Sequence, residues 1–262
     1  MVVSSHFKIE SFGKSDVGLL RNNNEDVFRE LPKEKFFILA DGMGGHNAGE
    51  VAASRAVEYM CSGIQTLFQT SKDSLELEEI QMHVESVIEN TNLWVHHLGA
   101  SNPSFYGMGT TLCSILFFKE FIVYSHVGDS RIYRFRKGKL TPLTNDHTTF
   151  SKNLPSGENR NGVSLPRKVL AKAIGTSMFV TPEIKSEKAE ASDIYLLCSD
   201  GLTDLVSDNL IESLLKNYTD LNQVASHLIE TAKESGGHDN ITLLLIRTHD
   251  IPGQQRNNPP SP

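Results

Sequence analysis

The sequence has few of the features that mark membrane, secreted or nucleic-acid-binding proteins. Within its 262 residues no apolar run approaches the roughly 20 residues that a membrane-spanning helix needs, and residues 1–10 lack the apolar stretch of a signal peptide. The three cysteines stand apart in apolar surroundings, which favours core positions over disulfide bonds or zinc ligands. A formal net charge of -7 argues against a nucleic-acid partner, because proteins that bind polyanions usually carry a basic surface. We therefore expect a monomeric cytoplasmic protein that binds neither membranes nor nucleic acids.

Several common phosphate and cofactor motifs are also missing. The sequence has no complete Walker phosphate loop. Gly42, Gly44, Gly45 and Gly49 superficially resemble a dinucleotide-binding loop, but their register is wrong and the downstream acidic residue for a ribose is absent. Cys198 lies inside an apolar run and lacks the arginine-rich loop of a cysteine phosphatase, so we interpret it as a core residue.

What the sequence does contain is a repeated pattern in which an apolar run ends at an acidic residue. Residues 36–40 are apolar, Asp41 follows them, and glycines then predict a tight turn directly after this acid. The pattern recurs at residues 194–201, where the acid is Asp200, and residues 124–129 form a third run that ends at an aspartate. A single Asp-Gly pair is most often an ordinary surface turn. Three such carboxylates in one chain instead indicate an acidic site that needs cations.

The order of the remaining segments predicts two antiparallel sheets covered by helices. Apolar residues at helical spacing predict amphipathic helices at residues 49–68, 74–98, 208–216 and 221–234. Strands are predicted at residues 110–118, 121–127, 131–135, 193–199 and 241–247, with an edge strand at 5–15. Polar composition predicts an ordered loop or irregular strand end at residues 15–26, a long loop inserted at 144–168 and a disordered tail at 250–262. Strands that follow strands, and helices that arrive in consecutive pairs, favour an α+β fold.

Acidic residues in turns or at strand ends supply a candidate ligand set for a hard divalent cation. These residues are Glu25, Asp26, Asp41, Asp129, Asp200 and Asp239. Carboxylate oxygens without an accompanying Cys/His set favour Mg²⁺ or Mn²⁺ over Zn²⁺. Without a metal ion, so many carboxylates would repel one another and some of them would have to bind protons.

Arg21 is the basic residue best placed to hold a substrate beside such a centre. A guanidinium can grip a phosphate through two parallel hydrogen bonds, and metal ions can polarise a phosphoester and lower the pKa of bound water. Together these features describe hydrolysis of a phosphate ester. Taken alone, Arg21 is more often a surface ion-pair residue. Likewise, His46, His126 and His147 could each be a general acid or a structural histidine, and the residues leave these alternatives open.

Six short motifs follow one another in the order typical of one enzyme family. They are Asp16-Val-Gly-Leu-Leu-Arg21-Asn-Asn-Asn-Glu25-Asp26, Asp41-Gly-Met-Gly-Gly-His46, Gly109-Thr110-Thr111, Val127-Gly-Asp129-Ser-Arg131, Ser199-Asp200-Gly201 and Gly237-His-Asp239-Asn240. With these motifs, which span residues 16–240, the chain resembles the metal-dependent protein serine/threonine phosphatases (the PPM or type 2C family) in their compact bacterial form. The resemblance implies a four-layer αββα sandwich, formed by a single phosphatase domain at residues 1–249.

The resemblance also implies a role for each site residue. Asp41 would bridge two metal ions and take part in catalysis, with the Gly42 carbonyl oxygen as a further ligand. The other implied metal ligands are Asp200 and Asp239 on one ion, Glu25 through a metal-bound water, and Asp129 with Asp200 on a third, weaker ion. Arg21 would bind the substrate phosphate, and Asp26 and Asn240 would orient the ligands. The implied cofactors are two or three Mn²⁺ or Mg²⁺ ions, which would activate the attacking water. The implied partners are phosphoproteins, including a serine/threonine protein kinase.

Two departures from the family pattern affect these expectations. Met43 stands where many eukaryotic members carry a histidine that is proposed as general acid, so the leaving group must receive its proton elsewhere. The insert at residues 144–168 takes the place of the family's flap but lacks an acidic, helix-forming stretch. His147 opens this insert, and we consider it a candidate substrate-binding residue and proton donor. The alternative function is a catalytically silent binding module, although no metal carboxylate of the family pattern is missing.

Overall fold

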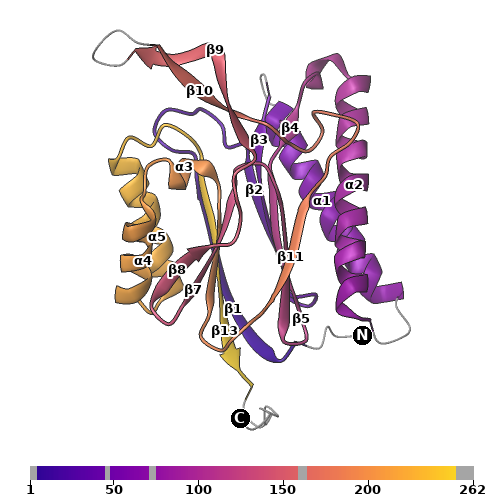
Figure 1. The fold of residues 1–262 in the computed structure, drawn as a ribbon, viewed down its shortest axis with the longest axis vertical. Coiled ribbons are helices and arrows are strands. Elements are labelled where there is room, and N and C mark those ends of the chain that lie inside the picture. Colours follow the sequence, from indigo (N-terminus) through magenta and orange to yellow (C-terminus); the bar gives the residue numbers. More distant parts are fainter. Residues whose placement is uncertain (1–4, 45–47, 71–74, 159–163, 252–262) are drawn as a thin grey trace.

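Two antiparallel β-sheets lie face to face at the centre of the molecule (Figure 1). The computed structural model describes residues 5–44, 48–70, 75–158 and 164–251, with the backbone alone for those between 150 and 168. The first sheet has the strand order β11-β6-β5-β3-β2, and a short strand, β4, pairs with the end of β3. Its strands are β2 (Asp26–Leu31), β3 (Phe36–Met43), β4 (Gly109–Thr110), β5 (Leu112–Phe118), β6 (Phe121–Val127) and β11 (Glu183–Lys188). The second sheet has the order β1-β13-β12-β7-β8 and consists of β1 (Phe7–Asp16), β7 (Arg131–Arg136), β8 (Lys139–Pro142), β12 (Ile194–Cys198) and β13 (Ile241–Asp250).

Helices cover the outer face of each sheet, which completes the predicted four-layer α+β sandwich (Figure 1). The first sheet carries α1 (Ala48–Thr70) and α2 (Leu77–Ser101), followed by the short 3-10 helix η1 (Pro103–Phe105). The second sheet carries α3 (Asp200–Thr203), α4 (Asp208–Asn217) and α5 (Leu221–Glu234). Within the described residues, no helix combines the length and the apolar character needed to cross a membrane.

The unbroken apolar run of β3 is explained by burial on both of its faces. Phe36, Ile38 and Ala40 pack under α1 and α2, whereas Phe37 and Leu39 face the second sheet. Because successive side chains of a strand point to opposite sides, a strand between two apolar layers needs no polar positions. This strand therefore lies at the centre of the fold, and Asp41 lies near its C-terminal end.

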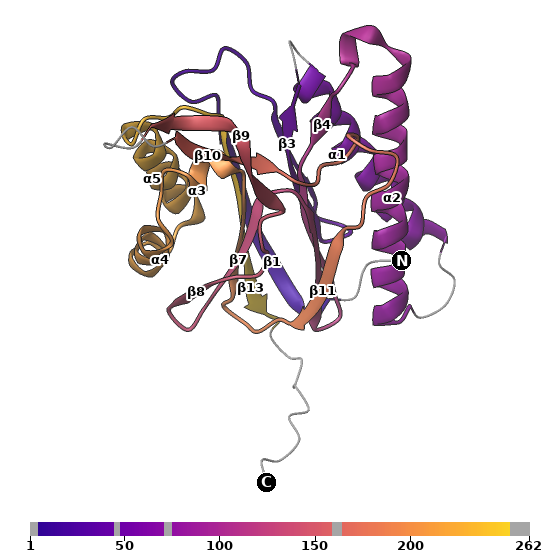
Figure 2. The same cartoon turned by 45° about the horizontal axis from the view of Figure 1, so that its top comes forward.

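One sequence prediction is corrected by the backbone. The insert predicted as a loop at residues 144–168 contains a β-hairpin of β9 (Thr148–Glu158) and β10 (Ser164–Leu170). Backbone pairing between two strands needs no apolar alternation, so polar composition concealed the hairpin. Figure 1 shows it projecting above the two sheets, and Figure 2 shows it extending across that end of the sandwich toward α3 and α5. The edge strand predicted at residues 5–15 is confirmed as β1, and most of the predicted tail (252–262) lies outside the described residues.

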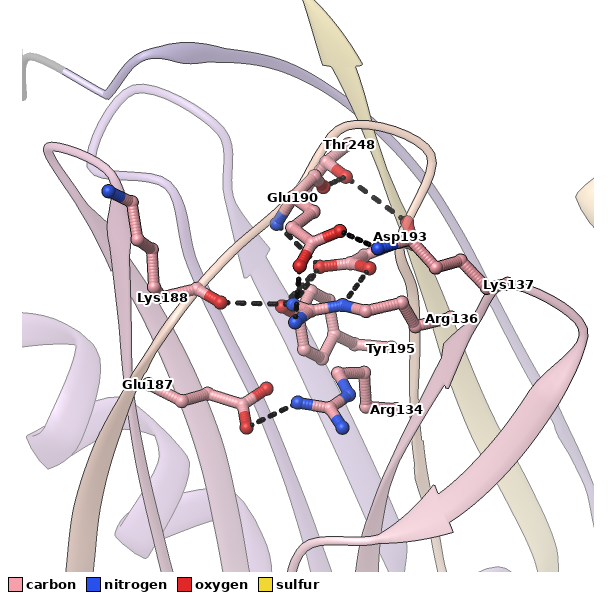
Figure 3. Close-up of polar contacts among 9 residues, drawn as sticks. All are labelled: Arg134, Arg136, Lys137, Glu187, Lys188, Glu190, Asp193, Tyr195 and Thr248. Atoms are coloured by element: carbon pink, nitrogen blue, oxygen red, sulfur yellow. Dashed lines mark hydrogen bonds and ion pairs between the residues drawn. The ribbon is translucent and has the colours of Figure 1, made fainter. Parts of the chain in front are cut away.

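At the opposite end of the sandwich, a polar network links the two sheets (Figure 3). Arg136 on β7 donates two hydrogen bonds to the Asp193 carboxylate, at 2.7 and 2.6 Å, and another to the Lys188 carbonyl oxygen at the end of β11. Beside it, Arg134 donates to Glu187 on β11 at 2.8 Å. The Asp193 side chain is only 1% exposed, so these charges are paired away from water. The network therefore joins β7 of the second sheet to β11 of the first.

Candidate active site

Five aspartates from distant parts of the chain converge at the hairpin end of the sandwich. Asp26 and Asp41 are direct partners on the neighbouring strands β2 and β3. Asp200 is the first residue of α3, directly after β12, and Asp239 precedes β13. Asp129 follows β6, and its charge and those of the other three aspartates all act on the Asp41 carboxyl. The structure therefore brings together the carboxylates that sequence patterns had marked separately.

Burial and mutual repulsion raise the pKa values of three of these carboxyls, those of Asp26, Asp41 and Asp200. Burial raises the pKa of Asp200 to about 7, and the negative charge of Asp129 adds to the effect. Burial also raises the pKa of Asp26 to about 6, although hydrogen bonds from neighbouring side chains oppose the change. The pKa of Asp41 lies well above its ordinary value, because burial and four nearby carboxylates all disfavour its charge. At neutral pH the cluster therefore needs positive charge if all of its members are to be ionised.

The donor set fits a hard divalent cation. Its side-chain donors are carboxylate oxygens, which Mg²⁺ and Mn²⁺ prefer, and among the described residues the three cysteines are buried away from such a role. One oxygen of Asp26, Oδ1, is buried without a hydrogen-bond partner, while Oδ2 accepts a hydrogen bond from Ser199 at 2.8 Å. An unsatisfied buried carboxylate oxygen costs free energy that a cation in the cluster would offset.

Hydrogen bonds to its backbone hold Asp41 in place. The Asp41 N–H donates to Thr111 Oγ1 at 3.0 Å, and the Asp41 carbonyl oxygen accepts from the Thr111 N–H at 2.8 Å and the Thr110 hydroxyl at 2.9 Å. Thr111 Oγ1 also lies 2.6 Å from the Ser130 hydroxyl, beside Asp129. These contacts join the strand end that carries Asp41 to the loop that carries Asp129.

Gly42 has a different role from the predicted turn. The strand does not end at Asp41, because β3 continues to Met43 and pairs with β4. A Cβ atom on Gly42 would lie 2.2 Å from the carbonyl oxygen of Gly49, in the first turn of α1, so only glycine fits there. The Gly42 N–H donates to the Glu25 carbonyl oxygen at 3.1 Å. The glycine therefore allows three backbone segments to meet beside Asp41.

Glu25 is buried at the same junction and is fixed through its backbone. Its N–H donates to Asn240 Oδ1 at 2.9 Å, and the Asn240 side-chain amide donates to the carbonyl oxygens of Val17 and Asn23. The Glu25 carboxylate accepts a hydrogen bond from Asn23 at 3.2 Å. Asn240 thus holds the loop after β1 against the start of β13, in keeping with the orienting role that was predicted for it.

Arg21 reaches the acidic cluster from that loop. Its Nη2 atom lies 2.7 Å from Asp239 Oδ2, in an ion pair whose arginine side chain is 49% exposed. One nitrogen of the guanidinium is therefore held by Asp239, a candidate metal ligand, and about half of the side chain remains exposed to solvent.

His147 lies beside the cluster and makes its own set of contacts. Its N–H donates to the Gly128 carbonyl oxygen at 2.9 Å, and its Nδ1 accepts from the Gly128 N–H at 3.1 Å. Its ring stacks on that of His126, with 4.4 Å between the ring centroids, and its Nε2 lies 3.8 Å from Glu183. Burial lowers the pKa of His147 to about 4, with the nearby His126 as a lesser cause. His46, the other histidine near the acidic motif, lies outside the described residues.

Some residues that organise the site had no assigned role in the sequence analysis. Thr111, Ser130 and Ser199 fall within the quoted motifs, and their place in those motifs was the one sign in the sequence that they belong to the site. Their hydrogen bonds to the aspartate network depend on contacts between different strands. Asp146 gave no signal of this kind. Its carboxylate forms a bidentate ion pair with Arg131, with hydrogen bonds of 2.8 and 2.9 Å, and this pair fixes the segment after Asp129.

Comparisons with known proteins agree with this geometry. Residues 21–245 match the family described as protein phosphatase 2C. The chain is 35% identical to the serine/threonine phosphatase Stp of Listeria welshimeri over 89% of this chain and 93% of that protein. The crystal structure of the serine/threonine phosphatase PstP/Ppp of Mycobacterium tuberculosis superimposes with a TM-score of 0.74 at 33% identity, covering 92% of this chain and 99% of that one. A structure of the PstP catalytic domain in complex with two manganese ions gives a TM-score of 0.72 at 32% identity, over the same shares of the two chains.

The family match covers most of the chain, and the similarity to the Listeria enzyme extends over nearly the whole length of both proteins. The fold is the one that the motifs implied. The chain belongs to the protein phosphatase 2C family and is a protein serine/threonine phosphatase.

Proposed function

We propose that the chain hydrolyses phosphoserine and phosphothreonine in proteins at a centre of two or three Mn²⁺ or Mg²⁺ ions. The observation that carries this proposal is the convergence of five aspartates, three of which (Asp26, Asp41 and Asp200) have raised pKa values that call for cations. In this proposal Asp41, Asp200, Asp239 and the Gly42 carbonyl oxygen would hold two ions, with Glu25 contacting their water shell. Asp129 and Asp200 would hold the third. A kinase among the substrates, a monomeric state and a cytoplasmic location remain predictions from the sequence.

Bound ions would polarise the phosphoester and lower the pKa of the attacking water. The chain's own residues bind and orient the substrate. Arg21 has five N–H donors, and Asp239 accepts from one of its Nη atoms, so further donors are available for two phosphate oxygens. The bond to Asp239 limits the motion of the guanidinium before the substrate arrives, which reduces the entropy that binding must remove. Asn240 and Thr111 hold Glu25 and Asp41 through backbone contacts, so these two acids keep their positions during turnover.

The direct test is hydrolysis of a phosphothreonine peptide by the purified chain, with and without chelation. We expect turnover with Mn²⁺ or Mg²⁺, complete loss after dialysis against EDTA and recovery when either ion is restored. Full activity after exhaustive chelation would contradict the metal-dependent mechanism. A chain that binds Mn²⁺ but never releases phosphate would support the binding-module alternative.

The raised carboxyl pKa values predict how the stability of the metal-free protein depends on pH. Asp26 and Asp200 bind protons more tightly in the folded chain, with pKa values of about 6 and 7, than in the unfolded chain, where 3.8 is the ordinary value. Their contribution to stability is therefore fully present below pH 4 and is lost as the pH rises through 6 and 7. In EDTA we expect the Tm to fall by roughly 5–10 °C between pH 5 and pH 8. Mn²⁺ should reduce this fall. A Tm in EDTA that stayed level or rose over this range, measured by differential scanning fluorimetry, would contradict the electrostatics described above.

Replacing Arg21 with alanine should weaken substrate binding without weakening metal binding. Loss of one or two charge-assisted hydrogen bonds to phosphate is expected to lower kcat/KM by roughly 10- to 100-fold, mainly through a higher KM. Because Arg21 pairs with Asp239, its removal leaves the aspartate cluster more negative, so Mn²⁺ affinity should hold or increase. Arg21→Lys should recover activity only in part, since lysine lacks the planar fork.

Arg55→Ala is the matched control for Arg21, because it removes an exposed arginine on α1 that pairs with Glu58. Its steady-state constants should equal those of the parent enzyme. An Arg21→Ala enzyme with unchanged kcat/KM, or one with weakened Mn²⁺ binding by calorimetry, would rule out the proposed division of roles.

A further inference from the structure

His126, His147 and Glu183 form a cluster beside the acidic centre, with three potential ligand atoms within 4.8 Å of one another. Such a set could hold a transition metal, but its hydrogen bonds argue otherwise. His147 Nδ1 accepts the Gly128 N–H, so this nitrogen carries no hydrogen and the ring proton lies on Nε2, which faces Glu183. His126 Nε2 lies 2.9 Å from the Asn145 carbonyl oxygen, which can only accept, so it is protonated too. The nitrogens that would have to bind a metal ion are therefore occupied by protons.

The same hydrogen bonds make His147 a clamp on the peptide before Asp129. Its backbone N–H donates to the Gly128 carbonyl oxygen, and its ring accepts from the Gly128 N–H, so both polar groups of Gly128 are held by one residue. Gly128 has a φ of +111°, which side-chain-bearing residues rarely adopt, and a Cβ there would lie 2.7 Å from Thr111. The chain therefore bends sharply at this point, immediately before Asp129.

Three further contacts fix the clamp itself. The His147 ring stacks on His126 at an interplanar angle of 17°. Its Nε2–H is directed toward Glu183 on β11, which also pairs with Lys185. Its carbonyl oxygen accepts the Ala171 N–H at 2.7 Å, which ties the two ends of the hairpin together. On the other side of Asp129, Arg131 is held by Asp146, so the loop that carries Asp129 is supported from both ends.

We propose that His147 is a positioning residue, which acts through Gly128 to fix the direction in which Asp129 projects toward the metal centre. This inference rests on the proposed function for the role of Asp129 as a metal ligand, but the clamp itself does not depend on catalysis. It replaces the sequence prediction of a proton donor with a role in which the ring stays neutral and does not touch the substrate. Outer-shell groups of this kind typically contribute about 10- to 100-fold to metal affinity or activity.

The test compares three substitutions of His147 that differ in whether the new side chain can accept the Gly128 N–H. Asparagine can place its amide oxygen near the position of Nδ1 and accept the Gly128 N–H, whereas alanine and glutamine cannot do so from that position. The first readout is hydrogen exchange of the Gly128 amide in the metal-free protein. The second is the Mn²⁺ concentration that gives half-maximal hydrolysis of a phosphopeptide. His249→Asn, on a partly exposed histidine near the opposite end of the second sheet, is the control.

We expect His147→Ala and His147→Gln to speed exchange at Gly128 and to raise the half-maximal Mn²⁺ concentration by about 10- to 100-fold. His147→Asn should stay near the parent in both readouts. Unchanged exchange at Gly128 in a folded His147→Ala protein would overturn the proposal. It would also fail if His147→Asn kept slow exchange but lost as much activity as His147→Ala, because the ring would then act on the substrate. Amide exchange requires no turnover, so failure of the proposed function and failure of the clamp are distinguishable.

Discussion

Asp41→Asn is expected to lower kcat/KM by about 100- to 1000-fold, the scale seen when a group that stabilises transition-state charge is removed. The substitution keeps the size of the side chain and the backbone bonds to Thr111, so the fold should survive. It removes one negative charge from a site where burial and four other carboxylates already disfavour that charge. The metal-free variant should therefore be at least as stable as the parent at neutral pH, although its Mn²⁺ affinity falls.

A metal ligand should lose activity on this substitution without losing stability in the metal-free state. An ordinary turn residue should not show this combination. The measurements are steady-state hydrolysis, Mn²⁺ binding by calorimetry, and the Tm in EDTA. Glu85→Gln, which makes the same change of charge on the exposed face of α2, should alter none of them. Near-normal hydrolysis by Asp41→Asn, or a large fall in its metal-free Tm, would contradict the metal-ligand role and indicate that Asp41 is a structural residue.

Asp193→Ala is expected to produce the largest loss of stability among the substitutions considered. The Asp193 carboxylate accepts two hydrogen bonds from Arg136, one from the Glu190 N–H at 2.7 Å and one from the Tyr195 hydroxyl at 3.0 Å. Its removal leaves the Arg136 guanidinium without its main partner between the sheets. Breaking a buried ion pair on one side typically costs about 3–5 kcal/mol. At this chain length that cost corresponds to a fall of roughly 6–20 °C in Tm.

The network lies at the opposite end of the sandwich from the aspartates, so the Asp193→Ala enzyme should keep the parent kcat at temperatures where it is folded. Glu10→Gln is the matched control, because Glu10 pairs with Arg247 and His249 in a more exposed setting. Exposed pairs contribute about 0–1 kcal/mol, so its Tm should change little. Equal changes in Tm for the two variants, followed by circular dichroism, would show that burial does not set the strength of the Asp193 network.

Local sequence was sufficient to locate the carboxylates that converge in the structure but not to explain how they are held. Asp41 and Asp200 follow long apolar runs, and such runs predict buried strands whose ends converge in a sandwich. The bonds from Thr111 to Asp41 and from Asn240 to Glu25 join residues 70 and 215 positions apart. These pairings depend on strand order and register, which composition and spacing do not determine.

The same limit applies to other parts of the chain. His147 was predicted to be a proton donor from its residue type, but its two hydrogen bonds with Gly128, 19 residues earlier, could not be predicted from spacing. The hairpin at β9 and β10 was concealed because its pairing is made by the backbone and its polar composition resembles that of a loop. Arg136 and Asp193, 57 residues apart, likewise meet only because β7 and β12 are neighbours.

The register of β1 with β13 determines how this enzyme can be attached to other molecules. Phe7 pairs with Asp250 at one end of the two strands, and Asp16 pairs with Ile241 at the other, next to Asp239. Ten strand residues at about 3.3 Å each place both ends of the described chain roughly 30 Å from the aspartates. Tags, surface linkers or fused domains can therefore be joined at either end without crossing the path of a phosphoprotein. An enzyme immobilised through these ends would present its aspartate cluster to the surrounding solution.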